Sequence, residues 1–157
     1  MVKPFNEDRL SIVPKLSADY PDISIFAVYD GHGGSGCADF LKEHIPKIIL
    51  KQDSMLRVDP ENALKNAFKE AEDEFMRRND IVIKDRSGSC ACLLMFIGDQ
   101  LYIANVGDSR AIMSMNDGNK SIELSKDHKP GEESEKRRII LGGGQLYQNG
   151  MPLGMIT

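Results

Sequence analysis

The stretch ISIFAVYDGHGGS, residues 23–35, joins an apolar run to a turn that carries an aspartate, a histidine and several glycines. Most residues in 23–29 are β-branched or aromatic, which predicts a buried strand. Asp30 ends that strand, and Gly31 allows the backbone to approach a ligand closely. Ser35 stands where it can cap a helix. The stretch therefore predicts a strand, a polar turn and a helix, in this order.

The polar groups of this turn have two interpretations. A carboxylate at Asp30 beside the free carbonyl of Gly31 offers hard oxygen donors, which suit Mg²⁺ or Mn²⁺. His32 is of the residue type that titrates near neutral pH and exchanges protons there. The alternative is an ordinary strand-to-helix turn with an incidental histidine. The DGHGG segment alone does not separate the two.

Two helices are predicted in the first half of the chain. One runs from Ser35 to about residue 50, although Pro46 should interrupt its second half. Asp59 caps the other helix, and Pro60 suits its first turn. The second helix has one apolar stripe, made of Ala63, Leu64, Ala67, Phe68, Ala71 and Phe75.

The sequence pattern changes at residue 87, from where apolar runs alternate with the turn signals GDQ, VGDS and NDGN. We expect four antiparallel strands, at about 87–97, 100–105, 110–115 and 121–124. A helix follows in residues 129–143, and QLYQNG, residues 145–150, starts another strand and turn. The residues expected in the core of the sheet are Ile25, Ala27, Val28, Leu93, Met95, Ile103 and Ala104.

The length fits one domain over residues 1–157, and helices between sheet-forming segments predict an α+β or a layered α/β fold. The net charge of −4 and the pI near 5.4 argue against a nucleic-acid binder. Three cysteines are an odd number, and we interpret them as reduced thiols in a reducing compartment. The sequence contains no apolar leader and no long apolar span. We therefore expect a cytoplasmic or nuclear protein that has no membrane partner.

Other acidic residues stand near predicted turns. Glu7 and Asp8 are adjacent just before a strand, so their side chains should point opposite ways. Taken alone, the pair is best interpreted as a solvated acidic turn. Asp108 lies in a glycine turn, where most aspartates bond the backbone. Arg110 could be its surface partner. Ser35 does not lie in a G-x-S-x-G nucleophile elbow, and the glycines match no nucleotide-binding pattern.

The order of the motifs is more specific than any one of them. The chain contains NEDR (6–9), FAVYDGHGG (26–34), SGSCA (87–91), LYIANVGDSRAIM (101–113) and LSKDHKPGEESEKRRIILGGGQL (124–146). This series closely resembles the metal-dependent protein serine/threonine phosphatases of type 2C. The resemblance extends from residue 6 to about residue 146. It implies an antiparallel β-sandwich flanked by helices, with metals in a channel between the two sheets.

The resemblance also implies roles for matching residues. Glu7 and Asp30 would hold a pair of Mg²⁺ or Mn²⁺ ions, with Asp30 bridging them and Gly31 contributing its carbonyl. Asp8 would contact metal-bound water, and Asp108 would serve a third, weaker metal. In such a two-metal site a bridging water becomes hydroxide and attacks phosphorus in line.

His32 matches the proposed general acid of the family, which would protonate the leaving serine or threonine oxygen. The implied substrates are phosphoserine and phosphothreonine proteins. Many members carry an arginine that grips the substrate phosphate, where this chain has Lys3. A lysine is a point charge and cannot reproduce the bidentate fork of arginine.

The sequence stops before the later motifs of the family, which supply two further metal-binding aspartates. We therefore expect a domain truncated at its C-terminal side, with a half-built metal site and negligible activity of its own. The alternative function is that of a non-catalytic pseudophosphatase or protein-binding module of the same fold. Exposed sheet edges would favour self-association.

Overall fold

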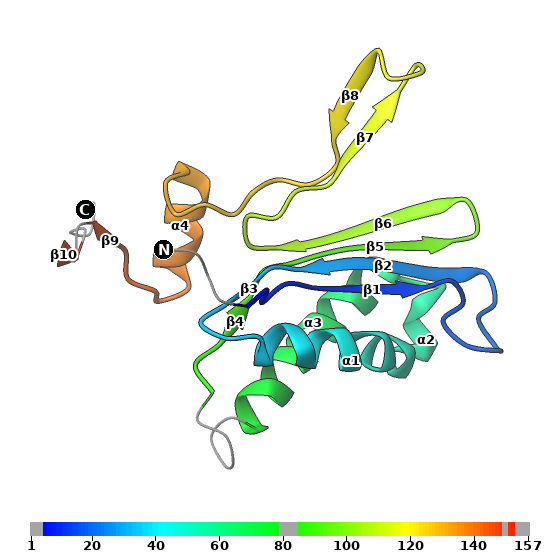
Figure 1. Ribbon diagram of the computed structural model, residues 1–157, viewed down its shortest axis with the longest axis horizontal. Helices are drawn as coiled ribbons and strands as arrows, with labels where there is room; N and C mark the ends of the chain where they lie inside the picture. Colours follow the sequence, from blue (N-terminus) through cyan, green and yellow to red (C-terminus); the bar gives the residue numbers. More distant parts are fainter. Residues whose placement is uncertain (1–4, 79–84, 149–150, 153–157) are drawn as a thin grey trace.

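Four antiparallel strands form the main sheet, in the order β1-β2-β5-β6 (Figure 1). Their bounds are Arg9–Val13 (β1), Ile23–Tyr29 (β2), Ala91–Ile97 (β5) and Gln100–Val106 (β6). The computed structural model describes residues 5–78, 85–148 and 151–152 of the chain. The strand predicted at residues 23–29 is confirmed with the same bounds.

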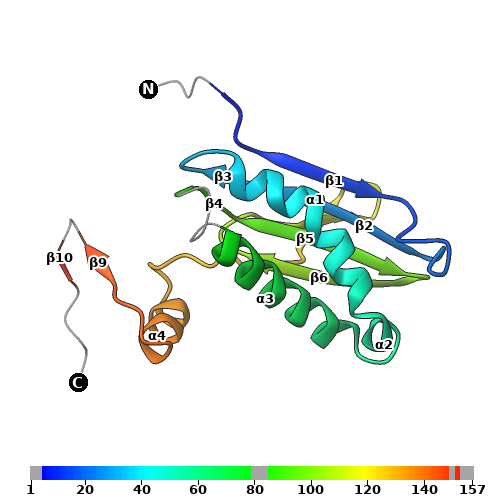
Figure 2. The same cartoon turned by 90° about the horizontal axis from the view of Figure 1, so that it is seen from below.

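Three helices cover one face of this sheet (Figure 2). They are α1 (Gly36–Lys51), α2 (Asp53–Leu56) and α3 (Pro60–Arg78). Asp59 caps α3 as predicted, because its Oδ1 accepts the backbone N–H of Asn62 at 3.2 Å. The α+β class, with antiparallel sheets and flanking helices, is therefore confirmed.

Pro46 does not end α1, which contradicts the predicted interruption. A proline inside a helix lacks the N–H that would bond the carbonyl four residues earlier, here that of Lys42. The hydroxyl of Ser11, on β1, donates to this carbonyl at 3.4 Å. A tertiary hydrogen bond thus replaces the helical one that the Lys42 carbonyl lacks because of Pro46.

The core lies between the sheet and the helices. In β2 the side chains alternate, so Ile23, Ile25, Ala27 and Tyr29 are buried against the helices while Phe26 and Val28 face the other way. Burial raises the pKa of the Tyr29 hydroxyl. The core cluster of buried apolar residues also takes in Ala38, Phe40, Leu41, Ile45, Ile48, Ile49, Leu56, Ala63, Leu64, Ala67, Ala71, Ala91, Leu93 and Met95.

Most of the predicted core is confirmed. Of the predicted sheet residues, Ile25, Ala27, Leu93 and Met95 are buried, whereas Ile103 and Ala104 are half-buried on the edge strand β6. In the helix stripe Leu64 is buried, and Phe68 and Phe75 pack against the core. The prediction for Val28 is wrong, because its side chain is 53% exposed on the face opposite the helices.

The predicted strand 87–97 is two strands. The first, β4 (Gly88–Ser89), pairs with the short β3 (Gly31–His32), and β5 begins two residues later. Further along, β7 (Ile112–Met115) and β8 (Lys120–Glu123) form a hairpin, followed by α4 (Glu133–Leu141). The small pair β9 (Tyr147–Gln148) and β10 (Met151–Pro152) comes last.

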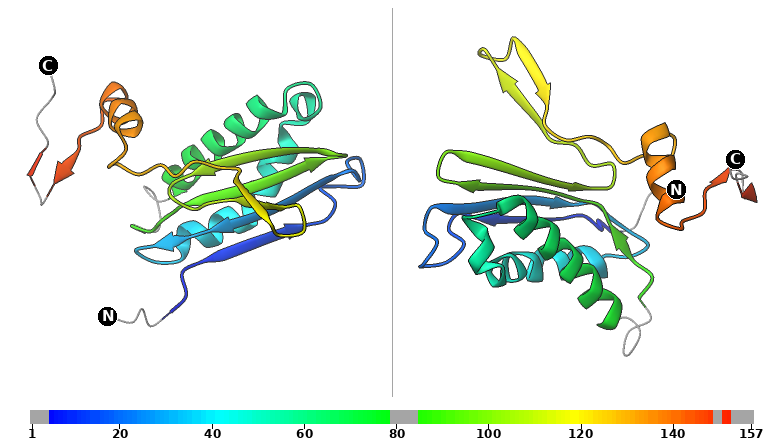
Figure 3. Two further views of the ribbon diagram at one scale, coloured as in Figure 1. Left: turned by 90° about the horizontal axis from the view of Figure 1, so that it is seen from above. Right: turned by 180° about the vertical axis from the view of Figure 1, so that it is seen from behind.

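The hairpin and α4 extend away from the layered part of the molecule (Figure 3). The hairpin stands on the side of the main sheet opposite α1 and α3 (Figure 1). Among the helices of the described residues, none is long and apolar enough to cross a membrane.

Candidate functional site

The turn after β2 is held by strand pairing. The backbone carbonyl of Asp30 accepts the N–H of Cys90 at 2.9 Å, and Gly31 and His32 then pair with Ser89 and Gly88. The side chain of Asp30 is exposed at the end of the buried strand. The carboxylate therefore reaches solvent from a backbone that the sheet fixes in place.

Gly31 is required by the N-terminal segment that passes beside it. A Cβ at this position would lie 2.3 Å from the carbonyl oxygen of Glu7, far inside contact distance. The carboxylate of Glu7 accepts the backbone N–H of Gly34 at 3.0 Å. Glu7 is thus brought to the DGHGG turn, as the resemblance implies.

Arg9 fastens the same segment to α1. Its guanidinium donates to the carbonyls of Asn6 at 3.0 Å and Asp8 at 2.8 Å, and also to the carboxylate of Asp39 at 3.2 Å. The hydrogen bond from Arg9 lowers the pKa of Asp39, and Ser35 adds to this effect. Asp8 itself is exposed. The sequence did not indicate this role of Arg9.

Ser35 precedes α1, but its side chain does not cap the helix. Its hydroxyl donates to Asp39 at 2.8 Å. The hydroxyl of Ser87 accepts the N–H of Cys37 in the first turn of α1 at 2.8 Å instead. The predicted helix start is thus confirmed, whereas the cap comes from a distant residue.

His32 has an exposed ring that lies against Gly88. A Cβ at residue 88 would be 2.4 Å from Nε2 of the ring, so the glycine makes room for it. The imidazole is therefore accessible from solvent at the same strand end as Asp30.

Asp108 comes from a different strand end. It lies in the turn after β6, where Gly107 has a φ of +94°, and a Cβ at Gly107 would come within 2.4 Å of the Cys90 sulfur. The Cys90 thiol donates to Oδ1 of Asp108 at 3.4 Å. Burial raises the pKa of this thiol, and the charges of Asp108 and Asp30 also raise it. Cys90 thus stands close to both aspartates.

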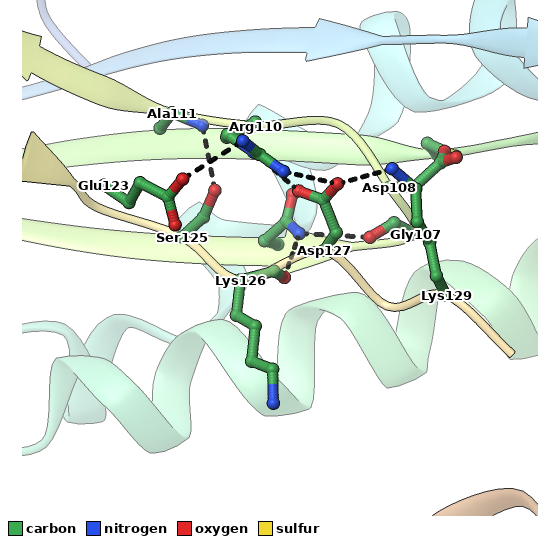
Figure 4. A network of polar contacts seen from close by, with 11 residues as sticks. Gly107, Asp108, Arg110, Ala111, Glu123, Ser125, Lys126, Asp127 and Lys129 are labelled. Carbon is green, nitrogen blue, oxygen red and sulfur yellow. Dashed lines mark hydrogen bonds and ion pairs between the residues drawn. The ribbon is translucent and has the colours of Figure 1, made fainter. Parts of the chain in front are cut away.

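A polar network holds the turn that carries Asp108 (Figure 4). Arg110 donates from Nε and from its second terminal nitrogen to the two oxygens of Asp127, both at 2.9 Å. Lys129 donates to Asp127 at 2.8 Å, and Arg110 donates to Glu123 at 3.1 Å. These hydrogen bonds hold the pKa of Asp127 well below its usual range, with the bond from Arg110 the largest cause. Arg110 therefore pairs with Asp127 and Glu123, not with Asp108 as considered from the sequence.

Two further contacts link this turn to the segment before α4. The carbonyl of Gly107 accepts the N–H of His128 at 2.9 Å and the side-chain amide of Asn105 at 3.2 Å. The same amide donates to the carbonyl of Lys126 at 3.1 Å. No sequence pattern indicated these contacts.

The three cysteines are unpaired, as expected from their odd number. Burial raises the pKa of Cys37 to about 11, so this thiol stays protonated at neutral pH.

The donor set fits a hard divalent cation, since Glu7, Asp30, Asp108 and the Gly31 carbonyl all offer oxygen. Within residues 5–78, 85–148 and 151–152, however, no group of three or more His, Cys, Asp or Glu side chains is placed to hold a metal ion. Glu7 lies at the Gly31–Gly34 turn, while Cys90 bonds the backbone carbonyl of Asp30 through its N–H and the carboxylate of Asp108 through its thiol. Lys3, the candidate phosphate contact, lies outside the described residues.

Comparison with known proteins identifies relatives across the whole chain. The family model of protein phosphatase 2C matches residues 2–156. "Probable protein phosphatase 2C 7" of Oryza sativa subsp. japonica is 36% identical and is matched over 88% of this chain and 36% of its own length. "Probable protein phosphatase 2C 76" of Arabidopsis thaliana is 38% identical over 82% of this chain and 30% of its own length.

Two solved structures share the fold. The structure of a Caenorhabditis elegans sex determining protein superposes with a TM-score of 0.74 and 26% identity, over 96% of this chain and 38% of the other. The serine-threonine phosphatase 2C of Toxoplasma gondii gives a TM-score of 0.72 and 24% identity, over 94% and 54% of the two chains.

The chain thus spans about a third of the length of the curated relatives it matches. The family model nevertheless covers nearly every residue, including both strand ends that carry Asp30 and Asp108. This chain belongs to the protein phosphatase 2C family.

Proposed function

We propose that the chain forms part of the catalytic domain of an Mg²⁺- or Mn²⁺-dependent phosphatase that acts on phosphoserine and phosphothreonine proteins. The carrying observation is the arrangement around Asp30. Its carboxylate is exposed at the end of a buried strand. The backbone there is held between the Glu7 segment and β4. A ligand that bridges two cations needs this combination of access and rigidity.

Glu7, Asp30 and the Gly31 carbonyl would hold the cations, and Asp8 would orient a water. When bound, such a metal pair supplies an activated water and neutralises charge that develops on the phosphoryl group. Asp108 would contribute at a separate, weaker position. The clamp between Arg110 and Asp127 supports that role, because it fixes the turn in which Asp108 lies.

His32 would donate a proton to the leaving serine or threonine oxygen. Its exposed ring, at the same strand end as Asp30, supports this role. Lys3 would add a positive charge for the substrate phosphate.

The second candidate is a non-catalytic relative that keeps the fold and binds a partner. The observation in its favour is that the described residues bring no three acidic, His or Cys side chains together as a metal site. Self-association through sheet edges also remains a proposal, and β1 and β6 are the edges concerned.

The test is Asp30→Asn in a fusion that appends to this chain the part of the rice relative that lies beyond its matched region. The control is Asp19→Asn, which makes the same change at an exposed aspartate of the β1–β2 loop. We expect Mn²⁺-dependent phosphate release from a phosphothreonine peptide. Asp30→Asn should reduce it at least about 100-fold, the scale of losing one transition-state stabiliser.

The 157-residue chain alone should release negligible phosphate in millimolar Mn²⁺, with EDTA-treated protein as the blank. Manganese titration followed by electron paramagnetic resonance should show weak binding that Asp30→Asn removes and Asp19→Asn leaves intact. Full activity of the Asp30→Asn fusion would exclude the bridging role. A fusion that folds and binds Mn²⁺ but hydrolyses nothing would favour the non-catalytic candidate.

A further inference from the structure

The two edges of the main sheet differ in how they are protected. The edge strand β1 has five residues, its Arg9 is paired with Asp39, and Pro14 and Lys15 follow it. The opposite edge strand, β6, has seven residues, QLYIANV, with no charge and no proline. Edge strands normally carry charges, prolines or bulges that prevent pairing with another chain. The β6 edge has none of these.

The free hydrogen-bonding groups of β6 can be assigned from the ladder. Cys90 and Gly98 donate to Asp30 and Asp22, on the β2 side, so the alternate residues of β5 bond β6. In β6 the inward groups then belong to residues 100, 102, 104 and 106. The N–H and C=O groups of Leu101, Ile103 and Asn105 point outward. They bond no other group in the described part of the chain.

Helix α3 makes a second wall beside this edge. In Figure 2 the first half of α3 lies outside the line of β6, and the helix crosses over the sheet toward its end. A groove of about 560 Å³ lies between them. Leu64 and Phe68 of the helix and Tyr102 and Ala104 of the strand give it an apolar floor.

We propose that this groove binds an extended segment of a partner protein, which adds to the sheet as an antiparallel strand beside β6. The outward groups of Leu101, Ile103 and Asn105 would bond its backbone, as in β-strand addition generally. The side chains of the segment would alternate. Those on the helix side would enter the groove, while the others would continue the face that carries Leu101 and Ile103.

The groove also favours a negative charge on the segment that it binds. Lys65, an exposed residue of α3, lines the groove and forms no ion pair with another described residue. The segment that fits best therefore has apolar side chains on its helix side and an acidic residue near Lys65. Glu61, one turn earlier on the same wall, disfavours a second acid at that end.

A second copy of this chain fits the edge less well. Two β6 strands joined about a two-fold axis would place both α3 helices on the same face of the joined sheet. Each α3 already overhangs its own β6 (Figure 2), so the two helices would compete for the space above the junction. A single strand without its own helix meets no such obstacle.

The experiment uses a fluorescein-labelled peptide, Thr-Val-Thr-Val-Thr-Glu-Thr, whose valines and glutamate share one face. Fluorescence anisotropy with the full 157-residue chain should show saturable binding. N-methylation of the threonine between the two valines blocks an N–H that faces β6 and should weaken binding at least about tenfold, the scale of one lost hydrogen bond. N-methylation of the second valine, whose N–H faces solvent, should leave affinity within about twofold.

Two protein variants locate the site. Lys65→Glu should weaken the binding of the glutamate peptide about fivefold or more, and the loss of affinity should be smaller in high salt. Lys69→Glu makes the same change on α3 at an exposed residue that does not line the groove, and should have little effect. Equal losses for both methylated peptides, or for both lysine variants, would overturn the proposal. So would sedimentation showing a dimer together with the absence of peptide binding, because a second copy would then occupy the edge.

Discussion

The layered half of the molecule and the part that follows β6 show opposite burial. In the layer, Ile23, Ile25, Ile45, Ile49 and Leu93 are wholly buried between sheet and helices. In the β7–β8 hairpin every residue of β7 is exposed, and in α4 the one buried residue is Glu135. Both parts form regular elements, so the difference between them lies in burial. Burial requires a second layer, which the hairpin and α4 do not have among the described residues.

The same contrast separates the two faces of the main sheet. The face toward the helices is closed, whereas the opposite face exposes Leu10 by 57%, Ile12 by 63% and Phe26 by 40%. The register places Leu10 beside Val28 and Ile12 beside Phe26, so these side chains form one continuous apolar surface. Surfaces of this kind mark sites of interaction or of further packing. The comparison therefore distinguishes a closed core from an apolar face that the described residues leave open.

The largest effect on stability should come from shortening a side chain in the closed core between the sheet and the helices. Ile25→Ala should lower the free energy of unfolding by about 2–5 kcal/mol, because it leaves a cavity in a closed layer. Ile12→Ala removes the same atoms from the open face and should cost far less. Ile112→Ala, in the 66% exposed position of β7, should stay within about 0.5 kcal/mol. Urea unfolding followed by circular dichroism measures all three. A loss for Ile12→Ala equal to that for Ile25→Ala would show that the open face is covered.

The sequence predicted the layered half well, for a physical reason. The run of β-branched and aromatic residues in 23–29 and the apolar stripe around Leu64 are local patterns that match one strand and one helix. Val28 belongs to the same apolar run, and its exposure depends on a second layer that no local pattern reveals. The continuation of α1 through Pro46 likewise depends on a hydroxyl from β1, more than thirty residues away in the chain.

The candidate site was predicted less completely. The motifs proposed Asp30, Gly31, Glu7 and His32 as candidates, and the structure brings Glu7 to the Gly31–Gly34 turn. The supporting contacts were not visible in the sequence. Arg110 is two residues from Asp108 in the sequence, yet its partner is Asp127. The β7–β8 hairpin lies between Arg110 and Asp127 in the chain and returns it to the same place. Contacts of this type depend on how the chain returns, which residue spacing does not determine.

An intermediate effect is expected at the helix caps, one in each region. Asp59→Ala removes the side chain that caps α3 and should cost about 0.5–2 kcal/mol of unfolding free energy. Glu132 occupies the corresponding position of α4 but makes no side-chain cap bond. Glu132→Ala should therefore stay within about 0.5 kcal/mol. Thermal unfolding of the two variants beside the parent chain provides the measurement. If Glu132→Ala were the more damaging, α4 would have to be docked and capped in solution.

The smallest effect concerns the clamp that joins the two regions. The pKa of Asp127 is lowered in the folded chain, chiefly by the hydrogen bond from Arg110 and then by Lys129. A carboxyl with a lowered folded-state pKa stabilises the fold above its unfolded pKa of about 3.9, and this contribution is lost as pH falls through the lowered value.

Between pH 8 and 5 the clamp should therefore be constant, and it should open only in acid. Because Arg110 and Lys129 are about half exposed and solvent screens their charges, the global stability should change little. Amide hydrogen exchange should detect the opening at the N–H of His128, which bonds Gly107. Asp127→Asn should lower the protection factor of that N–H at neutral pH, measured against the intrinsic exchange rate at each pH, and should remove its fall in acid. Asp117→Asn, in the turn between β7 and β8, is the matched control and should leave both unchanged. A protection factor at His128 that falls between pH 8 and 5 in the parent chain would exclude Asp127 as the group that holds the clamp closed.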